Sequence, residues 1–243
     1  PFMFAKENDF SDLVFPNNIL GENGIIGKIN SAIAEEDWKE IEIIGWLYQF
    51  YNSEKKDEVF LGLKNNKKLT KDTIPAATQL FTPKWIVKYM VENSLGKLAL
   101  EEIGVRESIK ENWKYLIEAE SKGVINNART EEIKIEDVKL LDPSMGSGHI
   151  LVYAFDVLYQ IYEELGYSRR EAVASIINNN LYGMDIDDRA ATLASFALVM
   201  KGREYFPRIF SALDNEEIEI NTLSIQESNS LEDGIIDSLK SHN

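Results

Sequence analysis

Apolar positions in the second half of the chain follow two different spacings. A short apolar run at 138–141 precedes a glycine-rich turn, and apolar residues at helical spacing follow over 150–165. Ser168 opens a capping-box pattern for another helix, after which 181–186 predicts a second strand and 190–201 a further helix. Strands and helices that alternate in this way form parallel sheets, so we predict an α/β fold. A third strand is predicted where apolar residues alternate at Ile218, Ile220, Leu223 and Ile225.

The first half of the chain has the spacing of helices. After the acidic stretch 35–37, apolar and aromatic residues predict a helix whose stripe faces the core rather than forming an aromatic ligand cage. Residues 64–68, rich in lysine, predict a solvated loop, and a second helical stretch over 98–122 is interrupted near Gly104 and ends at Gly123. The members of the stripe are Trp38, Ile41, Ile44, Leu47, Tyr48 and Tyr51.

Residues 142–148, with the sequence Asp-Pro-Ser-Met-Gly-Ser-Gly, separate the first predicted strand from its helix. Gly146 and Gly148 let backbone N–H groups approach a ligand that a Cβ atom would hold away. Asp142 ends the strand and provides an acceptor for a cationic or hydroxylated group. Asp185 ends the second strand, where open α/β sheets carry an acid that accepts hydrogen bonds from ribose hydroxyls. We therefore predict a nucleoside cofactor, and NAD is disfavoured because the turn lacks the third glycine of a dinucleotide-binding loop.

Two helix starts flank this turn in the sequence. Thr82 is a typical N-cap, Pro83 suits the first helical position, and an apolar face continues to Val91. Free N–H groups and the helix dipole favour a carboxylate or phosphate there, which makes Thr82 a candidate for the acidic end of a ligand. Taken alone, an ordinary helix cap is the simpler interpretation of Thr82. Asp187 and Asp188 are predicted to be turn and cap residues of the following helix.

Composition limits the possible functions. The chain has 26 Lys and Arg residues against 41 acidic residues, and its net charge of −15 repels DNA at long range. It has no cysteine and two histidines, which excludes disulfides and thiol catalysis and disfavours a metal site. The sequence contains no uninterrupted apolar run of about 18 residues. We expect a cytoplasmic protein without a membrane partner.

Three motifs occur in the order of a known enzyme class. Residues 142–148 resemble motif I of the amino-methylating DNA methyltransferases, Phe-Thr-Pro at 81–83 resembles motif X, and Gly-Met-Asp-Ile-Asp at 183–187 resembles motif II. The order X, I, II is that of the permuted class with most adenine-N6 enzymes. The longer strings 42–51 and 76–87 are similar to the PglX-like methyltransferases of BREX phage-defence systems and their type IIG restriction-modification relatives. This resemblance covers most of the chain.

The resemblance implies a partial Rossmann-like, S-adenosylmethionine-dependent methyltransferase sheet with a helical N-terminal extension. Residues 1–75 form the helical region, and 76–243 form the first part of the methyltransferase domain, with motifs X, I and II and a weak match to motif III. The family's catalytic motif is expected to lie beyond this chain.

The resemblance also implies which residues bind S-adenosyl-L-methionine. Thr82 meets the methionine carboxylate, Asp142 accepts from the amino group, and the segment 144–148 passes under the methionine portion. Asp185 holds the ribose hydroxyls and Ile186 lies against the adenine face. The expected set is Thr82, Asp142, Pro143, Ser144, Gly146, Ser147, Gly148, Asp185 and Ile186. Phe81 and Gln226 are secondary candidates, and Gln226 or Glu227 would contact the adenine edge.

One feature of the family is missing from the sequence. Adenine methylation uses an Asn/Asp-Pro-Pro-Tyr/Phe loop that accepts the target amino group's hydrogens and stacks an aromatic ring on the flipped base. None of the six prolines is followed by another proline. We expect this chain, which starts at Pro1, to be the N-terminal part of a longer protein, with no catalytic residue of its own and no activity by itself. The expected partners of the longer protein are double-stranded DNA and other defence-system proteins, with weak or no DNA binding by the acidic chain alone.

Two other functions stay open. A non-catalytic assembly or regulatory module with a cofactor-like pocket fits the acidic surface, and a methyltransferase for RNA or protein would share motif I. Binding of S-adenosylmethionine by the chain, compared with its Asp185→Ala variant, separates the module from the methyltransferases.

Overall fold

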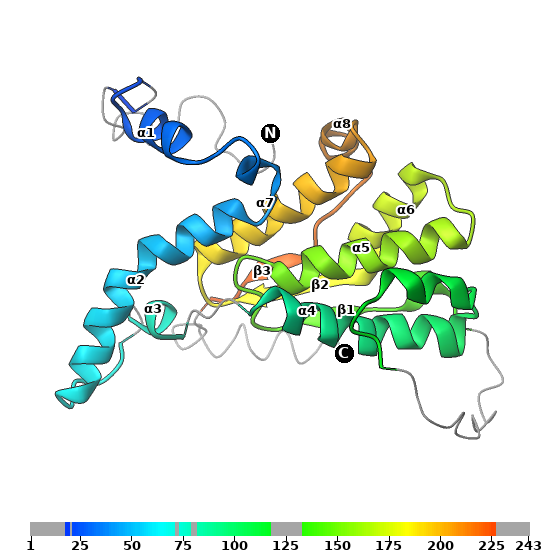
Figure 1. Cartoon of the computed structure of the whole chain (residues 1–243), viewed down its shortest axis with the longest axis horizontal. Coiled ribbons are helices and arrows are strands. Elements are labelled where there is room, and N and C mark those ends of the chain that lie inside the picture. The colour runs from blue at the N-terminus through cyan, green and yellow to red at the C-terminus, as the bar shows by residue number, and fades with distance from the viewer. Residues whose placement is uncertain (1–17, 20, 71–72, 79–81, 118–132, 227–243) are drawn as a thin grey trace, which may run out of the picture.

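A small parallel sheet lies at the centre of the structure (Figure 1). The computed structural model describes residues 18–19, 21–70, 73–78, 82–117 and 133–226. Its three strands are hydrogen bonded in the order β1-β2-β3, and both pairs are parallel. The predicted α/β class and parallel pairing are therefore confirmed.

The three strands are short. They are β1 (Leu140–Asp142), β2 (Leu181–Asp185) and β3 (Thr222–Ser224). The third strand is shorter than the apolar pattern predicts, because Ile218 lies before it and is buried in the hydrophobic core. Asp142 and Asp185 are the last residues of their strands, as predicted.

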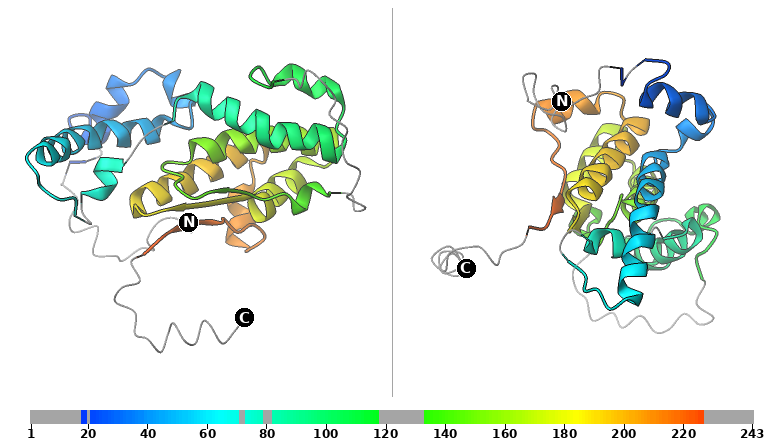
Figure 2. Two further views of the ribbon diagram at one scale, coloured as in Figure 1. Left: turned by 90° about the horizontal axis from the view of Figure 1, so that it is seen from below. Right: turned by 90° about the vertical axis from the view of Figure 1, so that its left-hand side faces the viewer.

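Two helices cover one face of this sheet. They are α5 (His149–Glu164) and α7 (Asp188–Tyr205), which lie side by side in Figures 1 and 2 and pack on each other. A Cβ atom on Gly183 would lie 2.8 Å from a side chain of α5. Thr222, the register partner of Gly183, shares a hydrogen bond of 2.5 Å between its Oγ1 and the Oγ of Ser195 in α7. Both helices thus pack on the same face.

The opposite face of the sheet is open in the part of the chain that the structure describes. It carries Leu141 and Leu223, whose exposed fractions are 54% and 63%. Parallel sheets are normally covered on both faces, so the described residues provide one half of that cover.

Four further helical elements, given at the end of this paragraph, complete the core around α5. The N-terminal neighbour α4 packs directly on α5, and a helical segment connects α5 to β2. Side chains of Phe155, Leu158 and Tyr162 on α5 are fully buried among them. The additional elements are α4 (Lys84–Val91), α6 (Arg169–Ser175), the π-helical segment η7 (Ile176–Asn180) and α8 (Ile209–Asp214).

The predicted caps fix two of these helix starts. The Glu171 N–H donates to Ser168 Oγ at 3.3 Å, and the Ser168 N–H donates to Glu171 Oε2 at 3.0 Å, which is the reciprocal capping box. Asp187 caps α7, since its Oδ1 accepts from the Arg189 N–H at 3.0 Å. Both caps confirm predictions that depend only on neighbouring residues.

A buried amide joins the starts of β1 and β2. Asn180 is fully buried, and its Nδ2 donates to the carbonyl oxygens of Ile135 and Val138 at 2.8 and 2.7 Å. Its Oδ1 accepts from the Tyr162 hydroxyl at 2.9 Å. These bonds satisfy the polar atoms that the sheet buries at this end.

The N-terminal region is helical, and its predicted stripe is confirmed in part, since Ile41, Ile44, Leu47 and Tyr48 are half-buried. The long helix begins at Ile43 rather than near Trp38, and Tyr51 is 74% exposed. The buried residues of this helix are Gly45 and Asn52, so a face with small and polar residues contacts the rest of the chain. The lysine-rich loop after the helix is confirmed. The elements are α1 (Ile25–Ala32), η2 (Asp37–Lys39), α2 (Ile43–Lys64) and α3 (Ile74–Thr78).

The chain continues beyond α4 as helical turns of different pitch. The predicted interruption is confirmed at Gly104, whose φ of +79° ends the second of two π-helical segments. Gly123, the predicted stop, lies outside the described residues. The elements between α4 and β1 are η3 (Glu92–Gly96), η4 (Ala99–Ile103), η5 (Glu107–Asn112) and η6 (Ile135–Asp137).

In the described ranges, none of the helices has the length and apolar character that crossing a membrane requires.

Candidate functional site

The glycine turn forms a compact link between β1 and α5. The Ser144 N–H donates to Asp142 Oδ1 at 3.1 Å, and the Met145 N–H donates to the carbonyl of Met184 in β2 at 3.0 Å. Gly146 has a φ of +54°, in the left-handed region that favours glycine. The turn is thereby held against the carboxyl ends of both strands.

Asp185 connects the two strand ends. Its Oδ2 accepts from the Gly146 N–H at 2.9 Å, and its Oδ1 accepts from the Asp187 N–H at 2.9 Å. A carboxylate has about four acceptor positions, so each oxygen keeps one for a further donor. Asp185 can therefore order the turn and accept from a ligand at the same time.

A cavity of about 330 Å³ lies over this junction. Its volume falls in the range of about 300 to 1,000 Å³ that small-molecule and cofactor sites occupy. The turn, the end of β2 and the segment before α4 all contribute to its wall. The lining residues are Pro75, Thr78, Thr82, Asp142, Pro143, Ser144, Met145, Gly146, Ser147, His149, Ile150, Asp185, Ile186, Asp187 and Ala190.

Most residues of the expected cofactor set line this one cavity. Thr82, from a distant part of the sequence, lies with the segment 142–147 and with Asp185 and Ile186. Phe81 lies outside the described residues. Motifs X, I and II therefore meet at one cavity, which their spacing in the sequence could not show.

Gly148 has a packing role between two helices. Its φ is +88°, and a Cβ atom there would lie 3.0 Å from the Cβ of Ala194 in α7. It does not line the cavity. Its missing side chain allows α5 and α7 to approach each other, and the expected approach of its backbone to a ligand stays a prediction.

Thr82 is not the N-cap of α4. The N–H groups of Ile86 and Val87 both donate to the carbonyl of Pro83, so Pro83 occupies the cap position and α4 begins at Lys84. The predicted cap is wrong by one residue. Thr82 instead lines the cavity next to the helix N-terminus, whose first N–H groups have no intrahelical acceptor.

Gln226 lies away from the cavity wall. Its Nε2 donates to Asp188 Oδ1 at 2.6 Å and to Ser224 Oγ at 2.8 Å. These bonds hold the side chain beside the N-terminus of α7, and the expected contact of Gln226 with an adenine edge stays a prediction.

The electrostatic character of the cavity is negative. Its ionisable lining side chains are Asp142, Asp185, Asp187 and His149, and no lysine or arginine of the described residues lines it. Burial, together with the charge of Asp185, raises the pKa of Asp142 despite the opposing hydrogen bond from Ser144 N–H. The cavity therefore favours a ligand with positive charge and disfavours a phosphorylated one.

Several residues that line the cavity were not predicted from any pattern in the sequence. Pro75 and Thr78 reach the cavity from α3, and Ala190 reaches it from α7. His149 and Ile150 could have been included, because they directly follow the glycine turn at the start of α5. In the described ranges, no group of three or more His, Cys, Asp or Glu side chains is placed to hold a metal ion.

Part of the chain matches a known protein family. Residues 108–235 match the family model described as "MmeI, DNA-methyltransferase domain". This match includes the glycine turn and all three strands.

Two named relatives match nearly the whole chain. The chain is 42% identical over 233 residues to "Adenine-specific methyltransferase BrxX" of Escherichia coli O9:H4 (strain HS), with 94% of this chain covered. It is 44% identical over 224 residues to "Adenine-specific methyltransferase PglX" of Lacticaseibacillus casei (strain Zhang), with 86% covered. The chain spans 18% of the length of each relative.

Proposed function

The chain belongs to the family of the MmeI DNA-methyltransferase domain, and we propose that its cavity binds S-adenosylmethionine for adenine-specific DNA methylation. The resemblance to BREX adenine-specific methyltransferases is confirmed by the two relatives. The observation that carries the proposal is one cavity, lined from all three motifs, with carboxylates and without lysine or arginine among the described residues. We propose that residues 1–75 form a helical region and that 76–243 begin a Rossmann-like methyltransferase domain.

The charge of the cofactor fits this cavity. S-adenosylmethionine carries a sulfonium and an ammonium group and has no phosphate. Asp142 accepts from the ammonium group, and the unused acceptor positions of Asp185 receive the ribose hydroxyls. NAD or a nucleoside triphosphate would bring phosphates against three aspartates that line the wall.

The ends of the cofactor fit the remaining wall. Thr82 and the N-terminus of α4 provide hydroxyl and N–H donors for the methionine carboxylate. Ile186 lines the cavity with a side chain that is 52% exposed, and it offers an apolar surface for the adenine ring. The turn 143–147 then lies under the methionine portion. We propose these roles on the motif resemblance and on their common cavity.

The reaction supplied by the cofactor is transfer of the sulfonium methyl group to the amino nitrogen of an adenine. This chain binds and orients the donor in our proposal, and the acceptor loop of the family, Asn/Asp-Pro-Pro-Tyr/Phe, does not occur in its 243 residues. We propose that the chain alone does not methylate. We propose DNA as the substrate of the methylation that this domain serves, with weak or no binding of DNA by this chain alone, because its net charge of −15 opposes that binding.

Titration calorimetry with S-adenosylmethionine tests the cofactor assignment. We expect saturable binding at a single site, and no binding of NAD at the same concentrations. A chain that bound NAD and not S-adenosylmethionine would refute the assignment. Incubation with labelled cofactor and DNA tests the second part, and methyl transfer by this chain alone would show that the inactivity proposal is wrong.

A further inference from the structure

One face of α2 contacts the outer wall of the cavity. Three of its positions, 42, 45 and 48, are three residues apart and lie on the same side of the helix or directly before it. Each meets a residue that lines the cavity, and the following paragraphs describe the three contacts. Figure 1 shows α2 beside α7, on which it packs.

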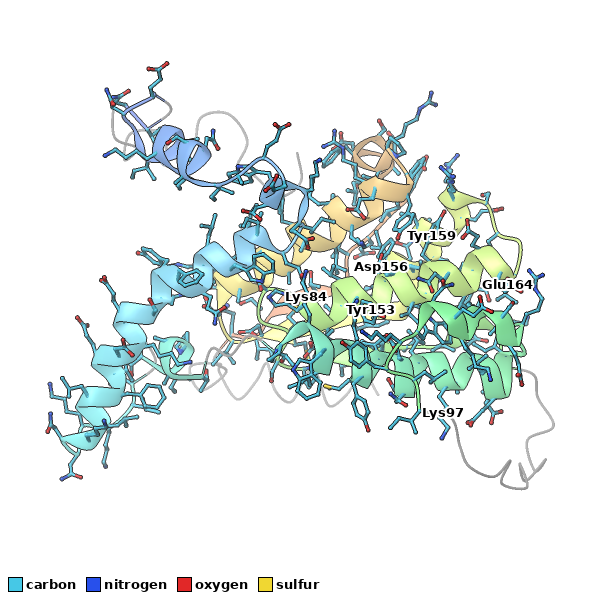
Figure 3. The ribbon with its side chains drawn as sticks, in the orientation of Figure 1. Lys84, Lys97, Tyr153, Asp156, Tyr159 and Glu164 are labelled. Atoms are coloured by element: carbon cyan, nitrogen blue, oxygen red, sulfur yellow. The ribbon has the colours of Figure 1, made fainter. Side chains whose placement is uncertain are left out.

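The first contact joins Glu42 to His149 at the start of α5. Glu42 Oε1 lies 2.6 Å from His149 Nδ1, and both side chains are largely buried. Glu42 Oε2 lies 3.1 Å from the Nζ of Lys84, which is labelled in Figure 3 and also bonds Glu40. Burial works to raise the pKa of Glu42, but His149 and Lys84 outweigh it and lower the pKa below 4.5. The contact is therefore made by an ionised carboxylate at neutral pH.

The second contact is between Gly45 and Ser147 of the glycine turn. A Cβ atom on Gly45 would lie 2.5 Å from Ser147 Oγ and 3.0 Å from Ser147 Cβ. Ser147 is 5% exposed, and its Oγ has no hydrogen-bond partner in the described part of the chain. Because Gly45 has no side chain, the backbone of α2 lies directly on the turn.

The third contact is a hydrogen bond across the end of β2. The Tyr48 hydroxyl donates to Asp187 Oδ2 at 2.5 Å. Burial and the Asp187 carboxylate raise the pKa of Tyr48, so the hydroxyl stays protonated and donates. Asp187 uses its other oxygen to cap α7, so the bond ties α2 to the helix that follows motif II.

We propose that Glu42, Gly45 and Tyr48 are positioning residues of the cofactor site, so that docking of α2 and binding of the cofactor are thermodynamically linked. They act through His149, Ser147 and Asp187. The inference rests on the proposed function, since it takes S-adenosylmethionine as the ligand.

The linkage follows because each contact is made to a residue that lines the cavity. A ligand that fits the cavity only when its wall is in place binds the docked state more tightly and stabilises it in return. The far side of α2 exposes Phe50 and Tyr51, each to 74%, so only one side of the helix contacts the cavity wall. The three contacts lie on that side, and α2 also packs on α3, whose Pro75 and Thr78 line the same cavity.

Matched glycine substitutions in α2 test the linkage by calorimetry with S-adenosylmethionine. Rotating Ser147 Oγ does not relieve the 3.0 Å contact with its Cβ, so Gly45→Ala must shift α2 from the turn. We expect affinity to fall about tenfold, within the roughly 5 to 150-fold range of coupled sites. Gly62→Ala is the control, because its Cβ would meet Lys67 at an ordinary 3.5 Å, and affinity should stay within about twofold of the unmodified chain.

Tyr48→Phe gives a second test that removes a single oxygen. We expect it to weaken S-adenosylmethionine binding about fivefold, again through coupling rather than direct contact. Hydrogen exchange measures the reverse effect: S-adenosylmethionine should slow exchange at 43–52, next to the cavity, more than at 53–64.

The outcomes separate this inference from the proposed function. If the unmodified chain binds no S-adenosylmethionine, both are wrong. If it binds, while Gly45→Ala or Tyr48→Phe lowers thermal stability and leaves affinity equal to that of Gly62→Ala, α2 has a purely structural role and the linkage is refuted. Reduced affinity with cofactor-dependent protection of 43–52 supports it.

Discussion

Replacing Asp185 with alanine should affect both the stability of the turn and the affinity for the cofactor. The substitution removes the acceptors of two hydrogen bonds, from the N–H groups of Gly146 and Asp187, each 2.9 Å long. A hydrogen bond to a charged group contributes about 1.5 to 3 kcal/mol, and the lower end applies because Asp185 is only half buried. We expect a loss of about 3 kcal/mol, which lowers Tm by roughly 6 to 12 °C in a domain of this size.

The effect on affinity is separate from the effect on stability. In the proposed site the carboxylate also accepts from the ribose hydroxyls, and losing one such bond weakens binding about tenfold to a hundredfold. Calorimetry with S-adenosylmethionine, performed well below the lowered Tm, measures this loss on folded protein. Thermal unfolding followed by circular dichroism measures the stability.

Asp188→Ala is the matched control. Asp188 is an exposed acid on the same segment that bonds Ser224 and Gln226 and does not line the cavity. We expect its affinity for S-adenosylmethionine to equal that of the unmodified chain. If Asp185→Ala binds as tightly as Asp188→Ala, the assignment of Asp185 to the cofactor is refuted, whatever its Tm.

Three further predictions concern the turn and the sheet. Gly148→Ala should have a free energy of unfolding in urea about 1 to 3 kcal/mol lower than that of Gly166→Ala. Both glycines have φ near +88°, but only a Cβ atom at Gly148 would meet Ala194. Equal losses of stability in the two variants would contradict the packing role of Gly148. Affinity for S-adenosylmethionine should fall on acidification at a pH above that of an ordinary aspartate, because the pKa of Asp142 is raised from 3.8 and only its charged form attracts the ammonium group. Asp142→Asn should bind weakly with a flatter calorimetric pH profile, and an unchanged profile would exclude Asp142 as the titrating group. Asn180→Ala should lower the free energy of unfolding by about 2 to 4 kcal/mol, as it removes the three hydrogen bonds that this buried amide makes to Ile135, Val138 and Tyr162, and a loss under about 1 kcal/mol would show that water replaces the amide.

Features that depend on neighbouring residues could be predicted from the sequence. The capping box at Ser168, the cap at Asp187 and the aspartates that end β1 and β2 all appear as expected. Each depends on hydrogen bonds or dihedral angles within a few residues, which a local pattern specifies.

Features that depend on distant segments could not be predicted. Gly148 packs against Ala194 of α7, and Gln226 is held by Asp188. The N-cap of α4 is also Pro83 rather than Thr82. The stripe predicted for the first long helix is correct only in part, because Tyr48 packs while Tyr51 is exposed; helical spacing defines faces but does not fix which one packs.

The sequence by itself determined the α/β class and the family and predicted the residues of the proposed cofactor site, because these depend on local periodicity and on motifs in a fixed order. Only the tertiary structure decided that Thr82 joins the glycine turn at one cavity and that α2 covers its wall. Glu42 and His149 are 107 residues apart, and Tyr48 and Asp187 are 139 apart. Contacts over such separations depend on how helices pack on the sheet, and no local pattern encodes that packing.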